Sequence, residues 1–259
     1  MRPQAGRRLL KTKRIIVAGP LVKVSLSPRG TAHDGPKARA AKRRLSSEAQ
    51  RRMNAKYRKD KLELLLACNF RPRDHFVLLT FRDGALPADE KGVNDAMKEF
   101  LRQLNRRVKG PRPVVFWRAE HRHEADDFRT DRRWHVHALI QARSGEDYAL
   151  LAACWTKGWI SIEPVKIDKD HSYAALAAYL TKEPTDRAGA HAWHQSRNAA
   201  RPEVESFPVP DDTTLQTPKG AVMLEEARER NEYGAMEYVK YLEPRGLRAP
   251  KRPKPKHRR

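Results

Sequence analysis

The sequence predicts an α+β fold, in which a central, mainly antiparallel sheet carries helices packed against it. Runs rich in β-branched and aromatic residues alternate with segments that repeat apolar residues at helical spacing, in the order β-α-β-β-α-β-α. Only a polar excursion separates the second strand from the third, which favours antiparallel neighbours. The expected strands span residues 76–81, 114–120, 134–140 and 159–163, and the expected helices span 93–108, 148–155 and 172–183.

Shifts in composition divide the chain into four segments. The first is a basic N-terminal arm, the second holds the strands and helices above, the third is punctuated by prolines, and the fourth is a basic tail. The segments span residues 1–45, 46–205, 206–243 and 244–259. The tail has eight Lys or Arg residues and no acidic residue, so we expect it to be disordered.

Three further elements are expected outside the central strands and helices. β-prone runs on both sides of Gly19 predict a hairpin in the N-terminal arm, which we prefer to a targeting peptide. A basic helix capped by Ser47 is expected to run to about Cys68. The apolar residues between Val222 and Leu242 predict one amphipathic helix, so the third segment is expected to be an accessory helical segment.

The charge of the chain predicts an anionic partner. The 259 residues carry a net charge of +22. Nucleic acid is a better candidate than a membrane, because no apolar run is long enough to span a bilayer. The only two cysteines, Cys68 and Cys154, lie far apart, which disfavours a disulfide scaffold or a zinc site and suits a reducing cytoplasm.

The strand expected at 134–140 contains the pair of residues best suited to hold a metal ion. Alternate side chains share a face of a strand, so His135 and His137 are expected to point the same way while Val136 and Ala138 face the core. Two imidazoles on a rigid strand can bind one divalent metal. The alternative is a pair of solvated histidines, because ten histidines produce such spacings by chance and His121 and His123 form a second pair.

A tyrosine and a carboxylate complete the candidate site. Tyr179 and Lys182 lie three residues apart and are expected to share one helical face, whereas Tyr173 does not share that face. Without a partner group, Tyr179 is as readily a core aromatic and Lys182 an ordinary lysine at a helix end. Glu120 ends the neighbouring strand and is the preferred third metal ligand. The competing third ligands are His121, His123, Glu124, Asp126 and Asp127 in the polar excursion.

Three of these stretches, in their order along the chain, resemble the motifs of the HUH-superfamily endonucleases. They are Phe76-Val-Leu-Leu-Thr-Phe81, Trp134-His-Val-His-Ala-Leu-Ile140 and Tyr179-Leu-Thr-Lys182. Within that superfamily the chain is most similar to rolling-circle replication initiators of plasmids, single-stranded-DNA phages and integrative elements. The resemblance covers roughly residues 46–205, which it identifies as the endonuclease domain.

The resemblance implies a related fold and a metal-dependent mechanism. His135, His137 and Glu120 would hold Mg²⁺ or Mn²⁺, Tyr179 would attack a phosphate of single-stranded DNA, and Lys182 would assist it. The product would be a 5′-phosphotyrosine adduct and a free 3′-hydroxyl. The expected partners are a replication origin and the host helicase and polymerase, with no membrane, in the cytoplasm of a bacterial host. The basic residues expected to contact DNA are Arg118, Arg133, Lys157 and Arg197.

One position departs from the pattern of the related two-tyrosine initiators. Those proteins have a second tyrosine four residues before the first, where this chain has Ala175. The resemblance therefore implies a single-tyrosine enzyme. Two alternatives stay open: a relaxase or single-tyrosine transposase with the same chemistry, and a non-catalytic protein that only binds nucleic acid.

Overall fold

The computed structural model is α+β, as the sequence predicts, with four α-helices and two antiparallel five-stranded sheets in the part that it describes. The chain groups into two compact units. Unit 1 comprises residues 1–68, 169–174 and 201–251, and unit 2 comprises residues 69–168, 175–200 and 252–259. The described residues are 10–28, 48–108, 112–121, 133–143, 147–168, 170, 172–181, 193–231 and 234–243.

Unit 2 contains the strands on which the predicted site depends. Its sheet has the order β6-β3-β5-β4-β7, and every neighbouring pair is antiparallel. The strands are β3 (His75–Thr80), β4 (Val114–His121), β5 (Arg133–Ile140), β6 (Ile160–Pro164) and β7 (His194–Gln195). The prediction that β4 and β5 are antiparallel neighbours is confirmed.

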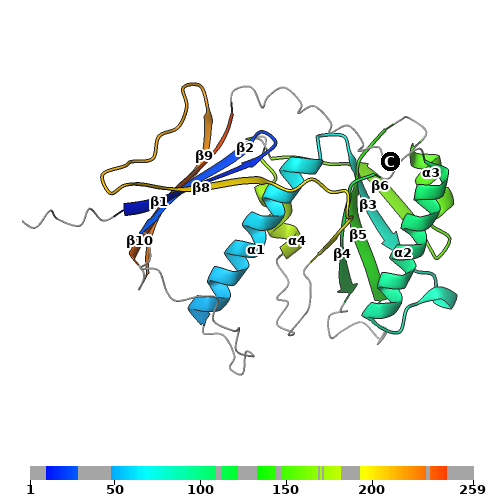
Figure 1. Cartoon of the computed structure of the whole chain (residues 1–259). Coiled ribbons are helices and arrows are strands. Elements are labelled where there is room, and N and C mark those ends of the chain that lie inside the picture. Colours follow the sequence, from blue (N-terminus) through cyan, green and yellow to red (C-terminus); the bar gives the residue numbers. More distant parts are fainter. Residues whose placement is uncertain are drawn as a thin grey trace, which may run out of the picture. The chain divides into compact units, whose positions relative to one another are not determined.

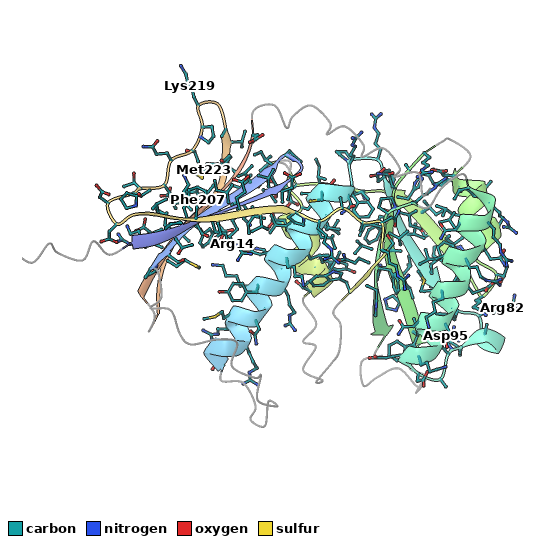
Figure 2. All side chains as sticks on the ribbon, viewed as in Figure 1. Arg14, Arg82, Asp95, Phe207, Lys219 and Met223 are labelled. Atoms are coloured by element: carbon teal, nitrogen blue, oxygen red, sulfur yellow. The ribbon has the colours of Figure 1, made fainter. Side chains whose placement is uncertain are left out.

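Two helices cover one face of this sheet, and the core of unit 2 lies beneath them (Figure 1). They are α2 (Glu90–Arg107) and α3 (Asp147–Cys154), and a 3₁₀ turn, η1 (Asp83–Ala85), precedes α2. Asp89 caps α2 by accepting a hydrogen bond of 2.8 Å from the Gly92 amide. The apolar stripe of α2 is buried, while Asp95 stands on its outward side, paired with Lys91 and Lys98 (Figure 2).

Unit 1 is built around the predicted N-terminal hairpin. Strands β1 (Leu10–Ala18) and β2 (Leu21–Pro28) lie in the middle of a sheet of order β8-β1-β2-β10-β9. The hairpin turns at Gly19, whose φ of 59° favours glycine. The other strands are β8 (Glu203–Pro210), β9 (Val222–Asn231) and β10 (Gly234–Leu242), and the helix of this unit is α1 (Glu48–Asn69).

The helix predicted over 222–242 is wrong, because this segment forms the antiparallel pair of β9 and β10. The accessory segment at 206–243 is therefore built of strands, not helices. Local composition misled the prediction, since Glu, Arg and Ala in β9 favour helix. Pairing of β10 with the distant β2 overrides that preference. The predicted disordered tail, residues 244–259, lies outside the described residues.

Charged side chains, rather than apolar ones, fill one inward position of the unit 1 sheet. The ammonium of Lys240 on β10 lies 2.8 Å from a carboxylate oxygen of Glu63 on α1 and 2.9 Å from one of Glu225 on β9. It also lies 3.7 Å from Asp60, which pairs with Lys23 of β2. Lys240 is only 3% exposed. We call these five residues the buried charge cluster.

The pKa values in the buried charge cluster reflect competition between burial and pairing. Burial raises the pKa of Glu63, against the opposing effect of Lys240. For Lys240, burial favours the neutral amine, but the carboxylates of Glu63 and Glu225 outweigh it and raise its pKa. Burial also opposes ionisation of Glu225, yet hydrogen bonds from Tyr238 and Lys240 lower its pKa to about 2. The cluster therefore holds its charges only because each of them is paired.

No helix in the described part of the chain is both long and apolar enough to cross a membrane.

Candidate active site

The predicted histidine strand is β5, which lies in the middle of the unit 2 sheet between β3 and β4. Its alternate residues Val136, Ala138 and Ile140 are fully buried in the core. His135 and His137 must therefore point to the opposite side of the sheet. The strand register pairs His135 with Thr80 and His137 with Leu78, so these β3 residues share that side. We call this side of the sheet the histidine face.

The two imidazole rings lie side by side on the histidine face. Their centroids are 5.0 Å apart with an interplanar angle of 77°, and the ring of Phe76 lies 5.7 Å from that of His137. Burial, and secondarily the charge of His135, lowers the pKa of His137 to about 4. The ring of His137 is therefore neutral at pH 7, which is the form that binds a metal ion.

The structure brings Tyr179 next to this pair. It lies on α4 (Ala174–Thr181), and its ring centroid is 6.2 Å from that of His137, in an edge-to-face arrangement. Tyr179 is 50% exposed, whereas Ala177 and Leu180 of the same helix are buried. The helix begins near Asp168, whose carboxylate accepts a hydrogen bond of 2.9 Å from the Ala175 amide. A fixed helix thus presents an accessible phenol at the histidine pair.

The other predicted members of the site are not brought together by the described residues. Lys182 lies outside the described residues, as do the side chains of Arg118 and Glu120. The register pairs the backbone of Glu120 with Trp134, whereas Ala119 is the residue opposite His135. No group of three His, Cys, Asp or Glu side chains suited to a metal ion occurs in the described part of the chain. The third ligand therefore stays a prediction.

The same register favours one of the competing candidates for the third ligand. His121 of β4 pairs with Arg133, which precedes His135 by two positions in β5. Residues two apart in a strand occupy the same side, so His121 is in phase with the histidine pair while Glu120 is one position out of phase. The side chain of His121 also lies outside the described residues.

The remaining predicted DNA contacts are dispersed over unit 2. Arg133 forms an ion pair with Asp83, Lys157 lies half-buried in the turn before β6, and Arg197 is exposed after β7. None of them has a described contact with His135, His137 or Tyr179. Their role in DNA binding stays a prediction.

The turn before β6 is a feature that the sequence did not single out. It extends the pairing of β3 with β6, because the Thr80 amide donates to the Trp159 carbonyl at 2.9 Å and the Arg82 amide donates to the Lys157 carbonyl at 2.9 Å. The indole of Trp155 donates to the Thr80 carbonyl at 3.0 Å from within the core. Five consecutive residues, 155–159, are thereby fixed against the end of β3.

Gly158 allows this turn to lie so close to β3. A Cβ atom at Gly158 would be 2.2 Å from the Thr80 carbonyl oxygen and 2.8 Å from the Arg82 nitrogen. Both atoms belong to the backbone and cannot rotate away. We expect Gly158→Ala to lower the free energy of unfolding by about 1–3 kcal/mol, as overpacking does, measured by urea denaturation.

Gly84 provides the matched control, because a Cβ atom there would meet nothing within 4 Å. Gly84→Ala should change the free energy of unfolding by less than about 0.5 kcal/mol or stabilise the protein slightly. Equal effects of the two substitutions would show that the close approach at Gly158 is unimportant.

Comparison with known proteins places the candidate site within a known family pattern. Residues 74–184 match the family model described as replication-associated protein, of the ORF2 and gene II protein type. The matched segment runs from just before β3 to just beyond α4, so it includes His135, His137 and Tyr179. Neither the curated proteins nor the solved structures gave a match. The family match is consistent with a rolling-circle replication initiator.

Proposed function

We propose that this chain is a metal-dependent endonuclease that nicks and rejoins single-stranded DNA at a replication origin and so initiates rolling-circle replication. One observation carries the proposal: an accessible tyrosine lies 6.2 Å, ring to ring, from a histidine pair, within the segment that matches a replication-associated family. A half-exposed phenol held by a buried helix face is suited to nucleophilic attack on a bound strand. The net charge of +22 supports the same class of substrate.

The proposed reaction is a transfer of the phosphoryl group from one oxygen to another. The phenolic oxygen of Tyr179 bonds to the scissile phosphorus as its proton passes to solvent, and the bond from phosphorus to the 3′ oxygen breaks. The departing 3′ oxygen takes up a proton and becomes a free 3′-hydroxyl, while the 5′ phosphate stays on the tyrosine. Attack by a 3′-hydroxyl on this phosphotyrosine reverses the reaction and joins the strand. A host polymerase would extend the free end, behind a host helicase.

The donor set supports a divalent metal ion in part. Two adjacent imidazoles, one of them neutral because of its lowered pKa, fit two positions in the coordination of such an ion. Mg²⁺ or Mn²⁺ held by His135, His137 and a third ligand would polarise the scissile phosphate. We propose Glu120 as this ligand, with His121 as the alternative that the strand register favours. Lys182 would stabilise the negative charge that develops near Tyr179.

The test is formation of a covalent adduct between protein and DNA. Labelled single-stranded oligonucleotides that tile the DNA around the coding sequence are incubated with the protein and Mg²⁺ or Mn²⁺, and adducts are resolved on a denaturing gel. We expect His135→Ala and His137→Ala each to reduce adduct formation at least about 100-fold, because each removes a metal ligand. EDTA should have the same effect on the unaltered protein.

His194→Ala is the matched control for the histidine substitutions. His194 also lies in the unit 2 sheet, but it pairs with Phe116 in β4, a residue of the core that stacks on it at 5.0 Å. It is thus associated with the core side and not with the histidine face, so its loss should leave the adduct intact. Adduct formation that survives EDTA and both histidine substitutions would overturn the metal-dependent mechanism.

A further inference from the structure

A tryptophan at the edge of the unit 2 sheet is unusually accessible. Trp159 is 62% exposed, the largest exposed fraction among the large hydrophobic side chains in the described part of the chain. An indole carries more apolar area than almost any other side chain, and burial of that area is favourable. An indole left this accessible is therefore available to a binding partner.

The strand pattern puts Trp159 on the histidine face. Ile160 and Ile162 of β6 pack against the core, so the alternate positions, Trp159 and Ser161, belong to the opposite side. The pairing agrees, because Trp159 is joined to Thr80 by a backbone hydrogen bond and Thr80 is opposite His135. Trp159, Thr80 and His135 thus form one row across three strands. Two strand spacings separate the ends of this row, about 10 Å between the Cα atoms.

The backbone of Trp159 is held as firmly as that of a strand. Its carbonyl accepts from the amide of Thr80, and the turn before it is fixed by the Trp155 indole and by the close approach of Gly158 to β3. An accessible side chain on a fixed backbone provides a binding surface that needs little ordering when a ligand arrives.

We propose that Trp159 is a stacking platform for a base of single-stranded DNA that lies across the histidine face. The inference rests on the proposed function, since it identifies how the same site holds its substrate. Bases stack on exposed aromatic side chains in proteins that bind single strands, and the phosphates contact basic groups. Lys157, two residues before Trp159 in the same turn, supplies a nearby cation. Trp159 is then a positioning residue that touches a base beside the scissile phosphate and takes no part in bond breaking.

The experiment compares a strand with bases against one without them. The probes are fluorescein-labelled (dT)20 and a 20-residue abasic deoxyribose-phosphate strand of equal charge, with binding followed by anisotropy. The protein carries Tyr179→Phe, so that no adduct forms. We expect Trp159→Ala to weaken binding of (dT)20 by about 5- to 150-fold. Binding of the abasic strand should not change, because that strand offers nothing to stack.

Further readouts separate stacking from a structural role. The salt dependence of (dT)20 binding should keep its slope, since no cation is removed. Trp159→Phe should restore most of the affinity, because it keeps an aromatic face. Tyr148→Ala is the matched control: Tyr148 is 47% exposed but lies on α3, on the core side of the sheet. Its loss should leave both affinities unchanged.

The outcomes also separate this inference from the proposed function. Equal affinity of Trp159→Ala and its parent for (dT)20 would overturn the stacking role, even where a metal-dependent adduct forms. An equal loss of affinity for both strands would overturn it as well, because the effect would not depend on bases. Base-dependent loss in a protein that never forms an adduct would sustain the stacking role and overturn the nuclease.

Discussion

Tyr179→Phe is expected to reduce formation of the covalent adduct by about 10⁴-fold or more, below detection on a denaturing gel. The substitution removes only the phenolic oxygen. The remaining ring keeps its edge-to-face contact with His137 at 6.2 Å, so the fold and the surface of the site should not change. Affinity for single-stranded DNA and the thermal unfolding midpoint should therefore match those of the unaltered protein.

Tyr173→Phe is the matched control for this substitution. Tyr173 directly precedes α4, but it is buried, whereas Tyr179 is half-exposed. A buried phenol cannot reach a phosphate of a bound strand, so Tyr173→Phe should leave the adduct intact. The opposite result, an adduct that survives Tyr179→Phe and is lost in Tyr173→Phe, would transfer the nucleophile to Tyr173.

The elements of unit 2 could be predicted from the sequence because their signals are local. In β5, three buried positions alternate with the two histidines, and in α2 the apolar residues recur at helical spacing. These periods also predicted that His135 and His137 share a face. The approach of Tyr179 to His137 was expected only through the family resemblance, since no local pattern specifies which face of a sheet a later helix covers.

The second sheet could not be predicted, because its signals are long-range and include buried charges. β10 pairs with β2, more than 200 positions earlier in the chain. At the inward positions of β10, Lys240 follows Tyr238, and a lysine at a core position hides the alternation that marks a strand. The partners that make this lysine tolerable lie on α1 and β9, and only the fold brings them together.

Strand register and exposure explain the remaining differences at the site. The preference for Glu120 rested on its place at a strand end, but its phase relative to His135 depends on the length of the excursion between β4 and β5. Trp159 was predicted only as the first residue of a strand. The signal that marks it is its alternation with Ile160 and Ile162, which face the core. An indole out of phase with two isoleucines was therefore the observable hint of an exposed aromatic.

Lys240→Met is expected to destabilise the protein by about 3–5 kcal/mol, because it leaves the carboxylates of the buried charge cluster without their central cation. Methionine has a similar length, so the loss comes from charge and hydrogen bonding more than from volume. Two contacts disappear, those of 2.8 Å to Glu63 and 2.9 Å to Glu225. Urea denaturation followed by circular dichroism gives the free energy of unfolding. Lys219→Met is the matched control, since Lys219 extends from a loop of unit 1 into solvent (Figure 2) and its loss should cost less than about 0.5 kcal/mol.

The effect of Lys240→Met should depend on pH in a defined direction. Without the ammonium, burial is less opposed and the pKa of Glu63 rises further above its usual value of 4.5. A carboxyl whose pKa is higher in the folded state destabilises that state above its usual pKa, and the penalty shrinks as the pH falls and the group is protonated. The difference between Lys240→Met and the unaltered protein should therefore be larger at pH 7 than at pH 4. Adding Glu63→Gln to Lys240→Met should recover part of the loss at pH 7, because the amide needs no counter-ion. A loss that is equal at both pH values and unaffected by Glu63→Gln would show that packing, and not the pairing of charges, makes Lys240 necessary.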